Sequence, residues 1–260
     1  MGTKDSSKTR VIPVFNILYA IDKTGKSWLP QILRLPTGGH NIRVNPNWDF
    51  TIEDRGWGSQ EKKLKPPVSL LSWLIRHPRM PSDGQLSEDS VKTQKRRELI
   101  EGSYNRLREA LSLLRDNPLK EDWHIFEGNT QPDVFIQTPD IVIVIEGKRT
   151  ESGATKNTKW MRGRHQIWRD IDCAWEIKGK REVFGFLIVE GDGLNYEVPA
   201  YWMDEAKATM SQGAVESSLP HRGPEEQRMI HQCFIGVTTW QRVCKEFGIN
   251  WRLLPDVTDK

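Results

Sequence analysis

The sequence predicts an α/β protein, because stretches typical of buried strands alternate with stretches that have the periodicity of amphipathic helices. The clearest strand covers residues 141–145, which are β-branched throughout. The clearest helix lies within residues 90–117, where apolar residues recur at steps of three and four. A further helical stretch over 160–178 leads into a second apolar strand over 183–190. This order indicates a central sheet flanked by helices.

Length and composition agree with a soluble globular protein. The 260 residues can form one large domain or a domain with an extension, and 37% hydrophobic with 28% charged residues is an ordinary balance. A net charge of +3 allows a nucleic-acid partner without arguing for one, so any basic surface must be local. No apolar run approaches the roughly 20 residues of a membrane helix.

The start of the chain and the cysteines indicate a cytoplasmic location. Residues 1–10 are polar and basic without an apolar core, so they do not form a secretory signal. Cys173, Cys233 and Cys244 are odd in number and form no C-x-x-C pair. This pattern favours reduced thiols over a disulfide frame or a zinc site.

Residues 1–86 are expected to form an N-terminal extension of unknown role. Residues 11–21 look like a strand, with Pro13 indicating an edge or a bulge. A linker rich in Pro, Ser, Asp and Gly precedes the second predicted domain, residues 87–258. The other expected elements of the extension are a short strand over 41–50, an exposed loop over 53–67 and a helix over 68–76.

The second domain begins with one long helix over 90–117, which Asn117-Pro118 ends. After the central hairpin, a helix and a strand continue the sheet. The remaining predicted elements are a strand over 123–127, helices over 160–178, 201–210 and 239–247, strands over 183–190 and 232–237, and a loop over 211–225.

A hairpin forms the centre of the predicted sheet, with Thr138-Pro139-Asp140 as its turn. Side chains alternate along a strand, so Glu146 and Lys148 project to the same face. A two-residue turn at Thr138-Pro139, or a loop of four residues, places Asp133 on that face as well, whereas a loop of three residues places it on the other.

Two carboxylates and an ammonium would then gather at one edge of an apolar sheet. Carboxylates this close repel each other unless a cation lies between them. Hard oxygen ligands with room for water suit Mg²⁺. The alternative interpretation is structural, with Asp133 as a turn residue and with Glu146 and Lys148 as a solvated strand end.

Pro132-Asp133, a hairpin-length gap and a buried strand ending in Glu146-Gly147-Lys148 resemble the PD-(D/E)XK nuclease superfamily. The resemblance covers roughly two thirds of the chain, residues 88–254. It implies the restriction-endonuclease-like fold, a mixed central sheet flanked by helices. It also implies a metal-dependent nuclease that hydrolyses phosphodiester bonds, an endonuclease acting on DNA in the first instance.

The resemblance also implies roles for individual residues. Asp133 and Glu146 would bind Mg²⁺, for which Mn²⁺ can substitute, with the backbone carbonyl of Gly147 as a further ligand. Lys148 would orient or deprotonate the attacking water and stabilise charge on the phosphate. Gln166 matches a glutamine found beside the metal on the helix after the E-x-K strand, although an ordinary amphipathic helix explains it equally well.

Many members of this superfamily take one more acid from a helix before the sheet. Glu101, in the predicted helix over 90–117, is the candidate for that acid. Glu127 is a second candidate, although a charge at a strand end is the simpler explanation for it. Several basic residues are candidates for phosphate contacts, or else belong to solvated surfaces: Lys95, Arg96, Arg149, Arg162 and Arg169.

Two other functions stay open at this point. One is a catalytically inactive nucleic-acid-binding or scaffold protein with the same fold, and the other is an RNA-cleaving nuclease. Whether the nuclease cleaves DNA or RNA, the expected partner is nucleic acid, and DNA is expected before RNA. A homodimer would supply the two active sites that double-strand cutting often needs.

Overall fold

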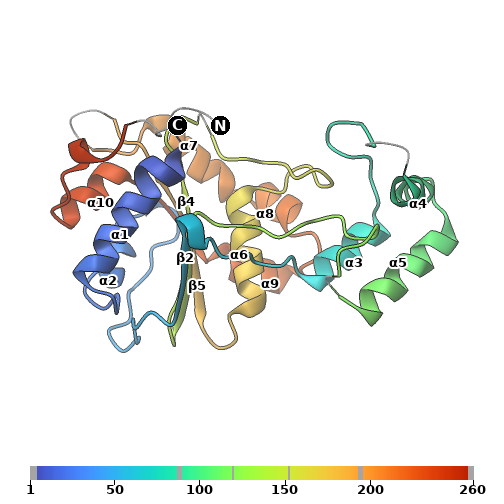
Figure 1. The fold of residues 1–260 in the computed structure, drawn as a ribbon, viewed down its shortest axis with the longest axis horizontal. Helices are drawn as coiled ribbons and strands as arrows, with labels where there is room; N and C mark the ends of the chain where they lie inside the picture. The colour runs from blue at the N-terminus through green and yellow to red at the C-terminus, as the bar shows by residue number, and fades with distance from the viewer. Residues whose placement is uncertain (1–4, 87–89, 119, 152, 193–195, 257–260) are drawn as a thin grey trace.

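The computed structural model describes residues 5–86, 90–118, 120–151, 153–192 and 196–256. These residues form an open, six-stranded mixed sheet with helices on both faces and a group of helices to one side (Figure 1). The fold class is therefore α/β, as predicted. The strands in chain order are β1 (Thr37–Gly38), β2 (Asp54–Trp57), β3 (Val134–Gln137), β4 (Ile141–Gly147), β5 (Glu182–Val189) and β6 (Phe234–Thr239).

The sheet has the strand order β1-β6-β5-β4-β3-β2. β2, β3 and β4 are antiparallel neighbours, whereas β4, β5 and β6 run parallel to one another. All seven residues of β4 are buried, because this strand has a neighbour on each side and helices on both faces. The strands predicted over 141–145, 183–190 and 232–237 are confirmed as β4, β5 and β6.

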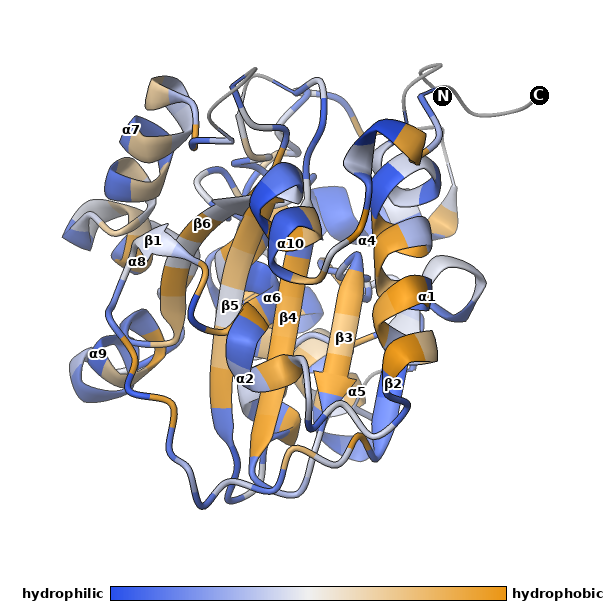
Figure 2. Cartoon of the chain, turned by 90° about the vertical axis from the view of Figure 1, so that its left-hand side faces the viewer, coloured by the Kyte–Doolittle hydropathy of each residue, from blue (hydrophilic) through white to orange (hydrophobic). Residues whose placement is uncertain are grey.

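Each face of the sheet has its own hydrophobic core. The central strands and α1 are coloured as hydrophobic in Figure 2. Alternation along β4 places Ile143 and Ile145 in one core and Val142 and Val144 in the other. The first face is covered by α1 (Ile12–Ile21), α2 (Leu29–Ile32) and α10 (Trp240–Glu246). The second is covered by α6 (Gln166–Ile177), α7 (Ala200–Thr209), α8 (Gln212–Ser218) and α9 (Pro224–His231).

The prediction of a strand over residues 11–21 is wrong. A π-helical turn, Ser7–Val11, leads into α1. The β-branched content favours a strand, but the buried positions follow a helical period: Val11, Val14, Phe15 and Leu18 all face the sheet. Pro13 is the second residue of α1 and directly follows the π-helical turn.

Other local predictions are wrong where pairing with distant residues decides the structure. Residues 53–67, predicted as an exposed loop, contain β2, which pairs with β3. Residues 41–50 and 123–127, predicted as strands, form none. The predicted loop over 211–225 contains α8 and the start of α9, and the helix predicted over 160–178 begins only at Gln166.

A helical lobe stands beside the sheet and consists of α3 (Val68–Arg76), α4 (Val91–Ile100) and α5 (Tyr104–Asp116) (Figure 1). It has its own apolar core, to which Phe126 and Met161 also belong. The helix predicted over 90–117 is divided because Gly102, with φ of 91°, ends α4, and Ser103 caps α5. The helix predicted over 68–76 is confirmed as α3.

The domain boundary predicted near residue 86 falls within this helical lobe. Strands from both sides of that boundary share the one sheet, since β1 pairs with β6 and β2 pairs with β3. The first four residues of the polar start, and residues 87–89 and 257–258 of the second predicted domain, lie outside the described residues.

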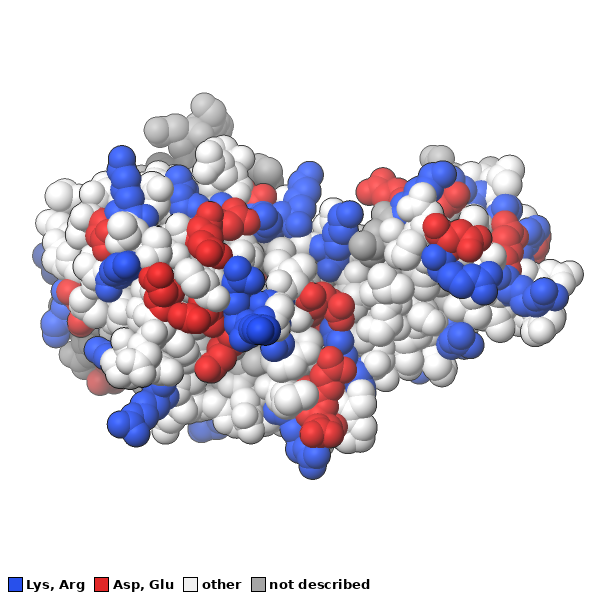
Figure 3. Space-filling model, turned by 90° about the horizontal axis from the view of Figure 1, so that it is seen from below, with Lys and Arg blue, Asp and Glu red and all other residues white. Residues whose placement is uncertain are grey.

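Viewed from below, the sheet body and the helical lobe meet at a narrower neck, and positive and negative side chains are interspersed over both (Figure 3). Cys173, Cys233 and Cys244 are unpaired and buried. None of the described helices combines the length and the apolar character that a membrane crossing requires.

Candidate active site

The hairpin of β3 and β4 brings Asp133 to the face that carries Glu146 and Lys148. The Thr138 amide donates to the carbonyl of Ile141 (2.9 Å), so the two-residue turn consists of Pro139 and Asp140. Val134 pairs with Ile145, which leaves Asp133 opposite Glu146. The turn lies one residue later than Thr138-Pro139, but its length is even, and the predicted shared face is confirmed.

Four of the predicted residues meet where β4 leaves the sheet. The Gly147 amide donates to Asp133 Oδ2 (2.8 Å). Lys148 Nζ donates to Glu146 Oε2 (3.2 Å) and to Gln166 Oε1 (3.0 Å). Glu146 is 1% and Lys148 9% exposed, so the ion pair between them is almost fully removed from water.

Helix α6 forms the other wall of this cluster. Its first residue, Gln166, contacts Lys148, and Asp170, four residues later, lies within hydrogen-bonding reach of Glu146. Four residues of helix advance about 6 Å. Two residues of strand advance about 6.6 Å. Because these lengths nearly match, one face of α6 can contact both Glu146, near the end of β4, and Lys148, just after that strand.

Asp170 is an acid of this cluster that the sequence prediction missed. It is fully buried, and its Oδ1 accepts a hydrogen bond from the Thr130 hydroxyl. No donor among the described residues reaches Asp170 Oδ2 or Glu146 Oε1. The sequence contains a signal for it, because a residue four positions after Gln166 lies on the same helix face.

Burial shifts the pKa values of all these groups. It raises the pKa of Asp133 to about 8, and the charge of Glu146 adds to the increase. Burial also raises the pKa of Glu146 and of Asp170, and the charge of Asp170 raises that of Glu146 further. For Lys148, burial lowers the pKa, but the charges of Glu146 and Asp133 outweigh it. The pKa of Lys148 is therefore raised, and the side chain stays an ammonium.

The cluster contains three acids, Asp133, Glu146 and Asp170, and one cation, Lys148. Carboxylates this close are ionised together only when positive charge lies among them, so the cluster suits an additional hard cation. The oxygens of Glu146 and Asp170 that lack a donor are acceptors such an ion would satisfy. As the side chains stand, no three Asp, Glu, His or Cys residues in the described part of the chain converge closely enough to enclose an ion. Lys148 Nζ donates a hydrogen bond to Glu146, and the Gly147 amide donates one to Asp133.

Neither of the two acids predicted to complete the site joins this cluster. Glu101 lies exposed at the end of α4, in the helical lobe. Glu127 is buried, and its Oε1 accepts from Arg164 (3.1 Å) and lies 3.4 Å from Arg169 Nε. Glu127 therefore belongs to an ion-pair network that packs α6, and the carbonyl of Gly147 stays a predicted ligand.

Two of the predicted phosphate-binding arginines near the site are engaged within the protein. Arg149 pairs with the carboxylate and the carbonyl of Asp256. Arg169 Nη2 donates to two backbone carbonyls, those of residues 128 and 129 (2.9 and 3.0 Å). Arg162 is exposed, and none of the described residues forms a hydrogen bond or ion pair with its side chain.

The two predicted contacts on α4 lie in the helical lobe and not beside the hairpin. Lys95 Nζ pairs with Glu109 (2.6 Å). Arg96 Nε donates to the carbonyl of Trp123 (2.8 Å) and is half-buried. Both side chains therefore stabilise the lobe itself.

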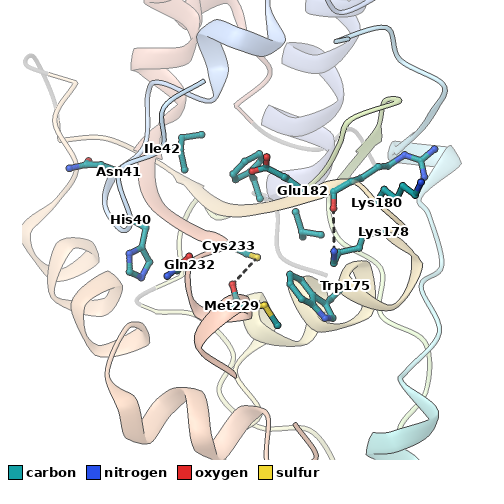
Figure 4. A pocket seen from close by; sticks show the side chains of 13 residues that line it. His40, Asn41, Ile42, Trp175, Lys178, Lys180, Glu182, Met229, Gln232 and Cys233 are labelled. Atoms are coloured by element: carbon teal, nitrogen blue, oxygen red, sulfur yellow. Dashed lines mark hydrogen bonds between the residues drawn. The ribbon is translucent and has the colours of Figure 1, made fainter. Parts of the chain in front are cut away.

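A separate cavity of about 420 Å³ opens near the first residues of β5 (Figure 4). Trp175 of α6 and Lys178, directly after that helix, reach it from one side, and His40 and Gln232 from the other. Glu182, in its wall, pairs in register with Ile141 at the start of β4, whereas the candidate site lies at the far end of that strand. Six residues of strand separate the two, about 20 Å, so the cavity plays no part in the site.

Comparisons of the chain with protein-family models, with curated proteins and with solved structures gave no match. A sheet with helices on both faces supports many chemistries, so the fold alone does not identify the activity. The function has to be argued from the residues gathered at the end of the hairpin.

Proposed function

We propose that this protein is a divalent-metal-dependent nuclease that hydrolyses phosphodiester bonds, most simply as an endonuclease acting on DNA. The observation that carries the proposal is the meeting of Asp133, Glu146, Lys148 and Gln166 at one buried strand end, with Lys148 Nζ between Glu146 and Gln166. Asp133, Glu146 and Lys148 resemble the motif of the PD-(D/E)XK superfamily, and Gln166 resembles the glutamine that many of its members carry on the next helix.

The order of the elements supports the same resemblance. The superfamily places a helix and then a strand before the hairpin, and a helix bearing glutamine after it. In this chain α1 packs on the sheet and β2 pairs with β3, with α2 and β1 between them in the chain, in place of the helix and strand expected over 90–117 and 123–127. The helical lobe is inserted between β2 and β3, and β5 follows α6 in parallel with β4.

Asp133 and Glu146 are the residues that would hold the metal. Hard oxygen donors with room for water favour Mg²⁺. When bound, this ion would lower the pKa of a coordinated water and neutralise charge on the phosphate. Lys148 would orient or deprotonate the attacking water, and its ammonium would stabilise charge on the phosphate. Gln166 holds Lys148 in place by accepting a hydrogen bond from Nζ.

The proposal predicts metal-dependent cleavage that requires Lys148. Plasmid, single- and double-stranded DNA and RNA oligonucleotides are incubated with the protein and Mg²⁺, Mn²⁺ or EDTA. We expect cleavage with either metal and none with the chelator. Lys148→Met keeps most of the stem volume and removes the charge, and should lower the rate by about a hundredfold to a thousandfold. Nucleic-acid binding should change little, whereas the melting temperature should fall because Glu146 loses its buried partner.

Lys180→Met is the matched control, because Lys180 is an exposed lysine near the opposite end of the sheet. Equal activity of the wild type and Lys148→Met would show that the site is assigned wrongly. Binding of nucleic acid without cleavage under any divalent metal would favour the scaffold function. Preference for the RNA oligonucleotides would favour the RNA-cleaving alternative.

A further inference from the structure

We infer that Asp170 is a third carboxylate ligand of the cation site, which is therefore built from α6 as well as from the hairpin. The inference rests on the proposed metal-dependent function and names a residue that the hairpin motif does not contain. The observations behind it are the hydrogen bonds of Asp170 and Glu146, the contacts that fix Asp170, and the ion pairs of the other acids nearby.

Asp170 has one oxygen that is satisfied and one that is not. Its side chain is fully buried, and Oδ1 accepts a hydrogen bond from the Thr130 hydroxyl. Oδ2 has no hydrogen-bond donor among the described residues, and Asp170 makes no ion pair with any of them. A buried carboxylate oxygen without a donor is unfavourable unless a cation or a proton satisfies it.

Glu146 shows the same arrangement from the opposite side. Its Oε2 accepts from Lys148 Nζ, whereas Oε1 is buried and has no donor within the described part of the chain. The two carboxylates lie within hydrogen-bonding reach of each other although both are acceptors. A divalent cation held by both groups would satisfy the two unpaired oxygens at once.

Contacts behind Asp170 hold it in this orientation. Thr130, which binds Oδ1, exchanges two backbone hydrogen bonds with Leu64 (both 2.9 Å). The neighbouring Arg169 fixes the preceding segment by donating to the carbonyls of residues 128 and 129. Metal-ligating carboxylates are commonly oriented by such outer hydrogen bonds. These contacts hold Oδ1 and leave Oδ2 of Asp170 as the oxygen available to a cation.

Other acids of the region have different partners. Asp172 on the same helix is equally buried, but its oxygens accept from Arg164 (2.8 Å) and Arg222 (2.9 Å). Glu127 is paired with Arg164, and α1, which packs on the sheet before the hairpin, contains no Asp or Glu. Asp170 is thus a buried acid beside Glu146 that makes no ion pair with the described residues, although the charge of the neighbouring Arg169 acts to lower its pKa.

The first test measures cation binding directly, with Mn²⁺ as the probe. Asp170→Asn keeps the shape of the side chain, and its amide can still bond Thr130 and donate to Glu146, so the fold should persist. Free Mn²⁺ is measured by electron paramagnetic resonance during a titration. We expect the variant to bind Mn²⁺ at least about tenfold more weakly than the wild type.

Glu176→Gln provides the matched control. Glu176 lies on the same helix, but it is exposed and pairs with Arg222. This variant loses the same charge and should bind Mn²⁺ like the wild type. Glu146→Gln is the positive reference and should lose binding at least as strongly as Asp170→Asn.

Anomalous diffraction from wild-type crystals soaked in Mn²⁺ gives a second measurement that does not depend on a variant folding. We expect the ion within coordination distance, about 2.0–2.6 Å, of an Asp170 oxygen as well as of Glu146. An ion held by Asp133 and Glu146 without Asp170 would overturn the inference.

The outcomes separate this inference from the proposed function. Unchanged Mn²⁺ affinity in Asp170→Asn, with cleavage that still requires Lys148, would overturn the role of Asp170 and leave the nuclease intact. Weakened Mn²⁺ binding in a protein that cleaves no nucleic acid would support the cation site and refute the nuclease. Failure of the wild type to bind Mn²⁺ would overturn the inference, and the chelator experiment would then decide the nuclease independently.

Discussion

Helix α6 carries two fully buried aspartates, two residues apart, with opposite electrostatic surroundings. Burial raises the pKa of Asp170, which faces Glu146. Burial also acts to raise the pKa of Asp172, but the charges of Arg164 and Arg222, with a contact from His221, outweigh it and hold the pKa well below its usual range. The partner, and not the degree of burial, decides the state of each carboxylate.

Asp172 should make the protein sensitive to acid. Its pKa is lower in the folded than in the unfolded protein, where it is about 3.9. Its stabilising contribution is therefore present above about pH 4 and is lost as pH falls toward the folded pKa. We expect Asp172→Asn to lower the free energy of unfolding at pH 7 by about 3–5 kcal/mol, because Arg164 loses a buried partner.

Urea unfolding between pH 7 and pH 3 measures this effect. The variant should lose less stability than the wild type as the pH falls below about 4. Glu176→Gln serves as the control, since Glu176 is exposed on the same helix. An identical loss in the wild type and Asp172→Asn would show that Asp172 does not contribute to the acid sensitivity.

At the scale of elements, the end of β4 depends on a close approach at Gly147. Glu146 and Lys148 face α6, so the residue between them faces the opposite layer. A Cβ at Gly147 would lie 2.8 Å from both Trp240 Cζ2 and Val11 Cγ2. Trp240 Nε1 also donates to the Lys148 carbonyl (3.1 Å). The glycine thus allows α10 and the N-terminal helical turn to hold the strand that carries the site.

Gly147→Ala should therefore destabilise the protein by overpacking, by about 1–3 kcal/mol. Thermal unfolding should show a melting temperature lower by about 2–4 °C for each kcal/mol. Gly213→Ala is the control, because a Cβ at that helical position of α8 meets nothing within 4 Å and should be neutral or stabilising. Equal melting temperatures of Gly147→Ala and the wild type would contradict the packing argument.

At the scale of the whole molecule, the helical lobe and the sheet body have separate cores (Figure 1). Among the described residues between 65 and 129, none belongs to either core of the sheet. The chain leaves and returns at one place, because Leu64 and Thr130 form an antiparallel bridge. The lobe is therefore an insertion, and we expect the sheet body to fold without it.

Replacing residues 67–125 by a flexible linker tests this independence. About six Gly and Ser residues reach up to about 20 Å, and Glu127 is retained for Arg164. Phe126 and Met161, which would lose their apolar neighbours, are changed to serine. We expect one cooperative unfolding transition and unchanged Mn²⁺ binding, measured by circular dichroism and by titration.

The full chain with only Phe126→Ser and Met161→Ser is the control for these two changes. A shortened protein without a cooperative transition would show that the lobe is required for folding. Nucleic-acid affinity measured on the same samples shows whether the lobe contributes to substrate binding.

Local pattern was sufficient for the central elements. β4 is β-branched and buried on both faces, and α6 and α10 have short, clear amphipathic periods, so their own residues specify them. The alternation rule was enough to place Asp133, Glu146 and Lys148 on one face, given an even turn. These predictions need only neighbours in the chain.

The remaining features depended on partners far away in the chain. β2 carries Asp54 and Arg55 and resembles a loop until it pairs with β3, while α1 resembles a strand until its helical face meets the sheet. Asp170 is an ordinary helical acid in the sequence. It becomes part of the site because α6 packs along β4, and only the tertiary structure decides which of several buried acids has a positive partner and which faces another carboxylate.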